Sequence, residues 1–538
     1  MSSQSVLPFF WLIREIHASL DELTPETEIP LLSCLSAKRL GLPTQAVRSV
    51  SILKESIDAR KKEAIVVVYT LIAETDRKPS NSGGYEPWMP DAIASPTRPE
   101  RLQPDRSRPV IVGAGPCGLF CALALAEAGL PPILLERGRP VADRQRDVSL
   151  YWREGSLNPE SNVQFGEGGA GTFSDGKLTT RIHDPRCGRV LDTLIACGAP
   201  EEIRHRAKPH VGTDRLVPAM VALRERLLRL GTEIRYSTRM ESLNLRLGRV
   251  CGVHLSDGSE IDTENVVLAI GHSARDTFAE LFRQGLSMEA KPFSVGVRIE
   301  HPQSAVDEAR YGTKRHYKLG PSEYQLFERY PDRTAYTFCM CPGGQVVAAA
   351  SETDTVVTNG MSNHDRDGVN ANSAFVVSVS PLDTGAHPLD GIAFQRQLEQ
   401  AAFRLGGRAN AAPVQRLGDF LSGRASSAAG SLKPSYTGEV RLARLDDALP
   451  AYITQRMRDA VPAFERKLRG FSNPDAMLTG FETRTSSPLR MLRGEDLSAI
   501  RTPGVFPAGE GAGYAGGIMS AAVDGLRAAE AVLNARGV

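Results

Sequence analysis

The stretch Val110-Ile111-Val112-Gly113-Ala114-Gly115-Pro116-Cys117-Gly118-Leu119 decides the fold of this chain, together with the acid Glu136. The apolar run 110–112 predicts a buried strand, 117–128 a helix rich in Ala and Leu, and 132–135 a second strand ending at the acid. Gly113, Gly115 and Gly118 have GxGxxG spacing. The first permits a tight turn, the second lets a pyrophosphate approach the backbone, and the third lets the helix pack on the strand.

This strand, turn, helix and strand predict a dinucleotide site. The unpaired N–H groups at the start of the helix favour phosphates, and Glu136 stands where a carboxylate accepts hydrogen bonds from a ribose diol. A carboxylate there disfavours a 2′-phosphate, which argues against NADP and leaves FAD and NAD open. The plain alternative is a glycine-rich turn without a ligand, but the strands and the acid are all in register for the dinucleotide.

The composition is that of an ordinary globular protein. The 538 residues carry 64 Lys and Arg against 63 Asp and Glu, so a net charge of +1 predicts no polyanionic partner. Eight cysteines without a C-x-x-C pair suit a reducing cytoplasm and predict no metal site. The apolar run 6–13 lacks the flanks of a signal peptide and is expected to be a strand, and no run reaches transmembrane length.

Two distant segments repeat the pattern of strand followed by glycine. They are 266–271, which ends at Gly271, and 505–510, which ends at Gly509 and Glu510. With 110–136 they resemble the glutathione-reductase-like flavoprotein fold, in which the three strands are neighbours in one parallel sheet. That resemblance implies FAD. It also implies that a helix starting near Gly516, Gly517 and Ile518 directs its N–H groups at the isoalloxazine ring. The family's usual acid is Asp, whereas this chain has Glu510.

A finer resemblance covers nearly the whole chain. The segments 56–62, 166–178, 296–302, 339–344 and 510–518 are similar to an uncharacterised bacterial family of FAD-dependent dehydrogenases. The resemblance implies fold and cofactor but no substrate. We expect the glycine-rich loop 166–177 to form a wall of the flavin site rather than a solvated Ω-loop. The further residues expected to bind the cofactor are Arg137, Gly169, Gly171 and Thr172.

These motifs predict an α/β chain of five segments. Residues 1–75 form a small N-terminal α+β unit and 76–107 a Pro-rich linker. The FAD-binding Rossmann-like domain is assembled from the discontinuous segments 108–275 and 481–538. Residues 276–480 form an inserted substrate domain with a mixed sheet.

Three cations are candidate catalytic residues. Lys177 ends the glycine-rich loop, Arg298 lies on a predicted strand, and Arg490 shares with Arg484 a loop that is able to hold a carboxylate or phosphate. The alternatives are a solvated lysine, an ion pair on the surface or between domains with Glu300 on the same strand face, and a merely charged loop. Cys339 and Cys341 are expected on one face of a strand, a spacing that strains a disulfide and argues against redox activity.

The sequence therefore predicts an FAD-dependent oxidoreductase that passes hydride between a small-molecule substrate and flavin N5. No second GxGxxG with strand context occurs, so NAD(P)H is expected only as a transient electron donor. One alternative is a non-catalytic flavin-bound scaffold or RNA-associated protein that uses the N-terminal unit, whose basic cluster is Lys54, Arg60, Lys61 and Lys62. Another is an NAD-linked dehydrogenase. Nucleic acid and membrane partners are not expected, and no oligomeric state follows from the residues.

Overall fold

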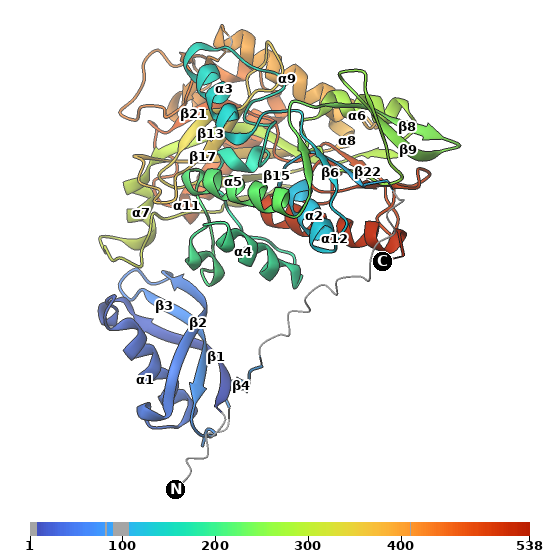
Figure 1. Ribbon diagram of the computed structural model, residues 1–538. Helices are drawn as coiled ribbons and strands as arrows, with labels where there is room; N and C mark the ends of the chain where they lie inside the picture. The colour runs from blue at the N-terminus through green and yellow to red at the C-terminus, as the bar shows by residue number, and fades with distance from the viewer. Residues whose placement is uncertain (1–7, 81–82, 90–106, 409, 538) are drawn as a thin grey trace. The chain divides into compact units, whose positions relative to one another are not determined.

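The computed structural model describes residues 8–80, 83–89, 107–408 and 410–537, which fall into two compact units (Figure 1). Unit 1 holds the N-terminal region together with residues 200–209 and 307–322. Unit 2 holds the rest of the chain and all of the predicted cofactor motifs. The predicted start of the apolar run at Val6 lies outside the described residues, as does most of the predicted linker.

Unit 1 is an antiparallel sheet with one helix. Its strand order is β2-β3-β1-β4, and α1 (Glu28–Leu40) ends at Gly41, which adopts the left-handed backbone that suits glycine (φ 67°). The buried residues alternate along β3, which gives the sheet one core face. The strands are β1 (Phe9–Ser19), β2 (Val47–Asp58), β3 (Val66–Thr75) and β4 (Tyr85–Pro87). The edge strand β4 lies within the segment predicted as a linker.

Two segments from later in the chain complete unit 1. Residues 200–209 contain the short helix η4 (Glu201–Arg204) and bond to β2, where the Glu55 N–H donates to the His205 carbonyl at 2.7 Å. From 307–322, Lys318 pairs with Glu28 at 2.6 Å and with Glu55 at 2.9 Å. All three side chains are largely buried.

The first layer of unit 2 is a parallel sheet of order β23-β11-β5-β6-β7. The three strands that the sequence predicts to be neighbours are adjacent, although about 400 residues separate the first from the last. Their residues are almost fully buried, as expected of a parallel sheet covered on both faces. The strands are β5 (Val110–Val112), β6 (Ile133–Leu135), β7 (Glu233–Arg235), β11 (Val266–Leu268) and β23 (Val505–Pro507).

Helices α2 and α12 lie side by side on this sheet, next to α5 (Figure 1). Residues 117–126 of α2 are all buried, which explains its Ala, Gly and Leu composition. The other face carries a core of apolar residues shared with α6 and the sheet β10-β9-β8. These elements are α2 (Pro116–Glu127), α5 (Thr213–Arg229), α6 (Arg275–Arg283), α12 (Ile518–Ala535), β8 (Met240–Arg246), β9 (Arg249–Leu255) and β10 (Glu260–Asp262). Two further helices, α3 (Val141–Glu154) and α4 (Arg186–Ala196), come after β6 in the chain.

The second layer of unit 2 is the predicted mixed sheet, of order β14-β15-β18-β13-β21-β19-β20. Its pairs are antiparallel except for β19 and β20. The strands are β13 (Phe293–Pro302), β14 (Phe327–Arg329), β15 (Thr334–Cys341), β18 (Asn370–Val379), β19 (Ala412–Arg416), β20 (Val440–Leu442) and β21 (Met477–Glu482). The accompanying helices are α7 (Gln303–Tyr311), α8 (Pro381–Thr384), α9 (Asp390–Gly406), α10 (Leu417–Leu421) and α11 (Ala451–Lys467).

Two small antiparallel pairs of strands complete the described sheets. They are β12 (Met288–Ala290) with β22 (Leu489–Met491), and β16 (Gln345–Ala348) with β17 (Thr358–Met361). The α/β class with parallel and mixed sheets is thus confirmed. Among the described residues, each helix is too short or too polar to span a lipid bilayer.

Candidate functional site

The glycine turn after β5 is fixed partly by the protein itself. A side chain at Gly113 would overlap the Ala269 carbonyl, and one at Gly118 would overlap the Gly113 carbonyl. Gly115 differs, because its φ is −77° and a side chain there would meet only the Cα of Gly169, at 3.8 Å. Neither the backbone nor the packing requires glycine at 115. The space in front of it adjoins the first N–H groups of α2, and it fits the close approach of a pyrophosphate.

The predicted cofactor segments converge on this turn. A side chain at Gly169 would lie 3.0 Å from the Cα of Gly115, and one at Gly171 would lie 3.0 Å from Ile518. A side chain at Gly511 would overlap the Gly271 carbonyl. The glycine-rich loop therefore lies between the turn and the start of α12. Three segments that are distant in sequence thus border one place, as a dinucleotide site of this kind requires.

Glu136 is buried and already holds three backbone N–H groups. One oxygen accepts from Gly138 at 2.8 Å and Gly166 at 2.9 Å, and the other accepts from Ala114 at 2.8 Å. A carboxylate accepts about four hydrogen bonds, so one position is left for a ribose hydroxyl. The residue thus joins three turns, and three of the acceptor positions of its carboxylate are filled by the protein.

Thr172 and Arg137 are also engaged by the protein. The buried Thr172 hydroxyl donates to the Glu167 carbonyl at 3.4 Å. Arg137 binds Glu160 at 2.7 Å and Asp276 at 2.9 Å, and its guanidinium lies 4.1 Å from the centre of the Phe165 ring. These contacts fix the arginine at the wall of a cavity, where the guanidinium is already paired.

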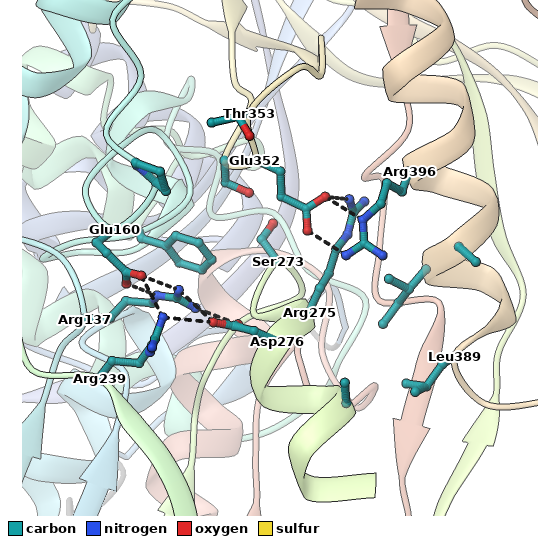
Figure 2. A pocket seen from close by; sticks show the side chains of 16 residues that line it. Arg137, Glu160, Arg239, Ser273, Arg275, Asp276, Glu352, Thr353, Leu389 and Arg396 are labelled. Atoms are coloured by element: carbon teal, nitrogen blue, oxygen red, sulfur yellow. Dashed lines mark hydrogen bonds and ion pairs between the residues drawn. The ribbon is translucent and has the colours of Figure 1, made fainter. Parts of the chain in front are cut away.

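This cavity of about 520 Å³ is lined by ion pairs (Figure 2). Arg239 joins Arg137 in binding Glu160 on one side. On the other side, Glu352 pairs with Arg275 at 2.9 Å and with Arg396 at 2.7 Å. Because carboxylates neutralise the arginines of the lining, we expect a polar uncharged ligand group here rather than a polyanion.

Behind the cavity lies a buried ionic triad that the sequence analysis did not predict. Glu399 lies between Arg275 at 2.7 Å and Arg484 at 2.9 Å, and all three side chains are at most 3 % exposed. Burial alone would raise the pKa of Glu399, but the two guanidinium groups hold it well below the usual range. The suggested use of Arg484 to bind a ligand carboxylate is therefore wrong, because its carboxylate partner is internal.

The start of α12 brings Glu510 to the Gly517 N–H, which donates to the carboxylate at 3.5 Å. Burial raises the pKa of Glu510 to about 7, against the lowering effects of this bond and of Lys291. A side chain at Gly516 would meet no protein atom within 4 Å. The helix end is thus open in front of a carboxyl group whose pKa is raised.

Lys177 and Arg298 meet at one short segment, residues 339–341, here called the cysteine bulge. The Lys177 ammonium donates to the Met340 carbonyl and pairs with Glu323 at 3.0 Å. Arg298, fully buried, donates to the Cys339 carbonyl at 2.9 Å. Lys177 is therefore not the solvated lysine of the alternative interpretation, because its ammonium group is engaged by a carboxylate and a carbonyl.

Arg298 pairs with Glu482 at 3.3 Å, not with Glu300. Burial raises the pKa of Glu482 to about 7, against the effect of this arginine. Glu300 accepts hydrogen bonds from Ser435 and Asn370 instead. The suggested ion pair with Glu300 is therefore wrong, because a strand neighbour on β21 supplies the carboxylate.

Arg490 does not join the other two candidate cations. It pairs with Glu289 at 3.1 Å across the β12–β22 pair and lies over the Tyr514 ring. Its side chain is 39 % exposed. No cluster of three metal-ligating side chains occurs among the described residues.

Comparison with known proteins agrees with a flavoprotein. Residues 292–485 match the family described as "FAD-dependent protein, C-terminal domain-like", and residues 14–74 match a domain of unknown function. Two solved structures are similar in part. Thermovibrio ammonificans THI4 is 18% identical over 34% of this chain and 63% of its own, less than two thirds, with a TM-score of 0.24. The FAD complex of glycerol-3-phosphate dehydrogenase from Bacillus halodurans is 12% identical over 81% and 66%, with a TM-score of 0.32.

Because both TM-scores lie below 0.5, these two likenesses carry no functional conclusion. A relative from Clostridium beijerinckii, itself described as an uncharacterised protein, is 45% identical over 533 residues, which cover 97% of this chain and 98% of the relative. The chain therefore belongs to the same family as the C. beijerinckii protein, and its residues 292–485 match the family described as "FAD-dependent protein, C-terminal domain-like".

Proposed function

We propose that this protein is an FAD-dependent oxidoreductase that transfers hydride between a small-molecule substrate and flavin N5. The observation that carries the proposal is Gly115. It is a glycine that neither its backbone nor its neighbours require, at a turn where two other cofactor segments converge. The match of residues 292–485 to FAD-dependent proteins supports the same cofactor. The glutathione-reductase-like arrangement of the FAD-binding domain belongs to this proposal.

Some of these residues would bind the cofactor, and others would act through their charge or their proton. When bound, FAD supplies the two-electron chemistry. The N–H groups at the start of α2 and Gly115 would hold its pyrophosphate, and Glu136 would accept one ribose hydroxyl. The start of α12, at Ile518, favours negative charge through its unpaired N–H groups and its dipole. Glu510, whose pKa burial raises to about 7, would take up or release a proton beside that end.

The half-buried Lys177 and the buried Arg298 would stabilise negative charge that develops on substrate or flavin. Lys177 and Arg298 are each paired with one carboxylate and one bulge carbonyl, so their positions are fixed before any ligand binds. A transient NAD(P)H molecule remains the proposed electron donor.

Stopped-flow reduction tests this role of Lys177. We expect Lys177→Met to retain FAD but to be reduced by dithionite at least tenfold more slowly, about 1.4 kcal/mol. The matched control is Lys433→Met, which removes an exposed lysine of the same unit. Equal reduction rates in the two variants would contradict a catalytic role for Lys177.

A further inference from the structure

The cavity of Figure 2 has two charged walls and one apolar wall. One charged wall holds the carboxylates Glu160 and Asp276 with the arginines that pair with them. The other holds Glu352 between Arg275 and Arg396. The volume of about 520 Å³ is in the range of pockets that enclose small organic molecules. The apolar wall comes from α6 and the start of α9, at Ala279, Leu389, Ile392 and Ala393.

The ion-pair network around Glu160 and Asp276 carries one excess negative charge. Arg137 and Arg239 are its two cations, whereas Glu160, Asp276 and Glu241, which pairs with Arg239, are its three anions. Burial raises the pKa of Asp276, but the hydrogen bond from Arg137 outweighs it and the pKa is lowered. Glu160 and Asp276 each accept three of the about four hydrogen bonds that a carboxylate can accept. This wall therefore attracts a cation and has acceptor positions left for it.

The network around Glu352 carries one excess positive charge. Among the described residues, the cations Arg275, Arg396 and Arg484 share two carboxylates, those of Glu352 and Glu399. Arg396 binds Glu352 through Nε and Nη2, which leaves its Nη1 for another acceptor. The buried Nε of Arg275 also has no partner in the part of the chain that the structure describes. This wall therefore attracts an anion and has N–H groups left for it.

The two excess charges cancel in sum but lie on different walls of the cavity. A ligand complements this arrangement when it has no net charge and carries opposite charges at its two ends. The apolar wall favours a ligand that also has an apolar part, because burial of apolar surface is favourable. Amino acids and short peptides with apolar side chains combine an ammonium group, a carboxylate and such a part.

We propose that this cavity binds a zwitterionic amino acid or dipeptide with apolar side chains. The ammonium group would lie against Glu160 and Asp276, and the carboxylate would accept hydrogen bonds from Arg396. The side chains would pack on Leu389 and Ile392 at the start of α9. The inference goes beyond the proposed function and does not depend on it.

Isothermal titration of the full chain, with its cofactor as purified, tests this assignment. The probes are leucine and leucyl-leucine, each compared with its amide, which lacks the carboxylate, and with its N-acetyl form, which lacks the ammonium group. We expect at least one of the two unmodified probes to bind, and both of its blocked forms to bind about tenfold more weakly or less. Binding of neither probe, or equal binding of the blocked forms, would overturn the proposal.

The variant Arg396→Met tests which wall holds the carboxylate. Its affinity for the unmodified probe should fall about tenfold, and its weak affinity for the amide should stay as in the wild type. The matched control is Arg408→Met, which removes an exposed arginine beyond the end of α9 that pairs with Glu439. Thermal unfolding establishes that both variants are folded. An equal loss for the probe and its amide, or the same affinities in the two variants, would contradict the role of Arg396.

Competition with adenosine tests whether the cavity is separate from the cofactor. We expect excess adenosine to leave the affinity for the probe unchanged. Displacement of the probe by adenosine would show that the cavity belongs to the cofactor site and would overturn the proposal. A chain that takes up no FAD but binds the probe would contradict the proposed function and leave the amino acid site standing.

Discussion

The glycine turn at 113–118 and the cysteine bulge at 339–341 both leave regular backbone geometry, but for different reasons. At the turn, Gly113 and Gly118 remove side chains that the neighbouring carbonyls would not admit. At the bulge, Cys339 adopts φ 46° with its side chain present, and Arg298 and Lys177 hold the adjoining carbonyls. Local composition thus explains the first irregularity, whereas cations from distant parts of the chain contact the carbonyls of the second.

The largest loss of unfolding free energy is expected when the buried guanidinium group at the bulge is removed. Arg298→Met leaves Glu482 buried without its cation, which should cost about 3–5 kcal/mol of unfolding free energy. The pKa of Glu482, already raised to about 7 by burial, should rise further. A folded pKa above the unfolded value penalises folding as pH rises, so the loss should be greater at pH 8 than at pH 5.5.

Urea unfolding of Arg298→Met at both pH values measures this difference, with Arg298→Lys as the control that keeps the charge. A loss that is equal at the two pH values would show that the buried carboxylate is not the cause.

A smaller loss of unfolding free energy is expected when a side chain is added at the tightly packed turn. Gly118→Ala places a methyl group against the Gly113 carbonyl, and overpacking of this kind costs about 1–3 kcal/mol. The midpoint of thermal unfolding should fall accordingly. An unchanged midpoint would mean that the turn has room to shift and that local sterics do not fix it.

The variant Gly115→Ala distinguishes the effect of the turn on protein stability from its proposed effect on FAD binding. A methyl group there meets only an atom 3.8 Å away, so the apoprotein should unfold at the wild-type temperature. FAD affinity, measured by fluorescence titration, should fall at least tenfold, about 1.4 kcal/mol. Unaltered affinity would remove Gly115 from the cofactor site.

The smallest effect is expected from changes that touch neither region. Replacing Arg60, Lys61 and Lys62 by Ser alters an exposed turn of unit 1, where Arg60 pairs with Asp58. FAD content should stay the same, and neither protein should retain RNA in a filter-binding assay. RNA retention that disappears in the triple variant would support the alternative of an RNA-associated protein.

The parallel sheet could be predicted because its signals are local. Strand, glycine spacing and acid occur in sequence at 110–136 and recur at 266–271 and 505–510, and the three strands are indeed neighbours. The mixed sheet could be predicted only as a class. Its strand order depends on contacts between segments that carry no spacing signal.

The ionic parts of the site could not be predicted, because pairing depends on partners far along the chain. Glu399 binds Arg275 and Arg484 from 124 and 85 residues away. Arg298 has a glutamate two residues along the chain, yet it pairs with Glu482 on β21. The bulge could not be predicted either, because strand alternation predicts a regular strand through the C-x-C segment.

The identity and amount of the bound cofactor test the central claim most directly. The wild-type protein should be purified under native conditions, heated, and its released flavin separated and quantified. We predict a yellow protein that releases FAD at about one molecule per chain, because only a dinucleotide reaches from Glu136 to the start of α12. Release of FMN alone, or a colourless protein that does not take up added FAD, would contradict the account.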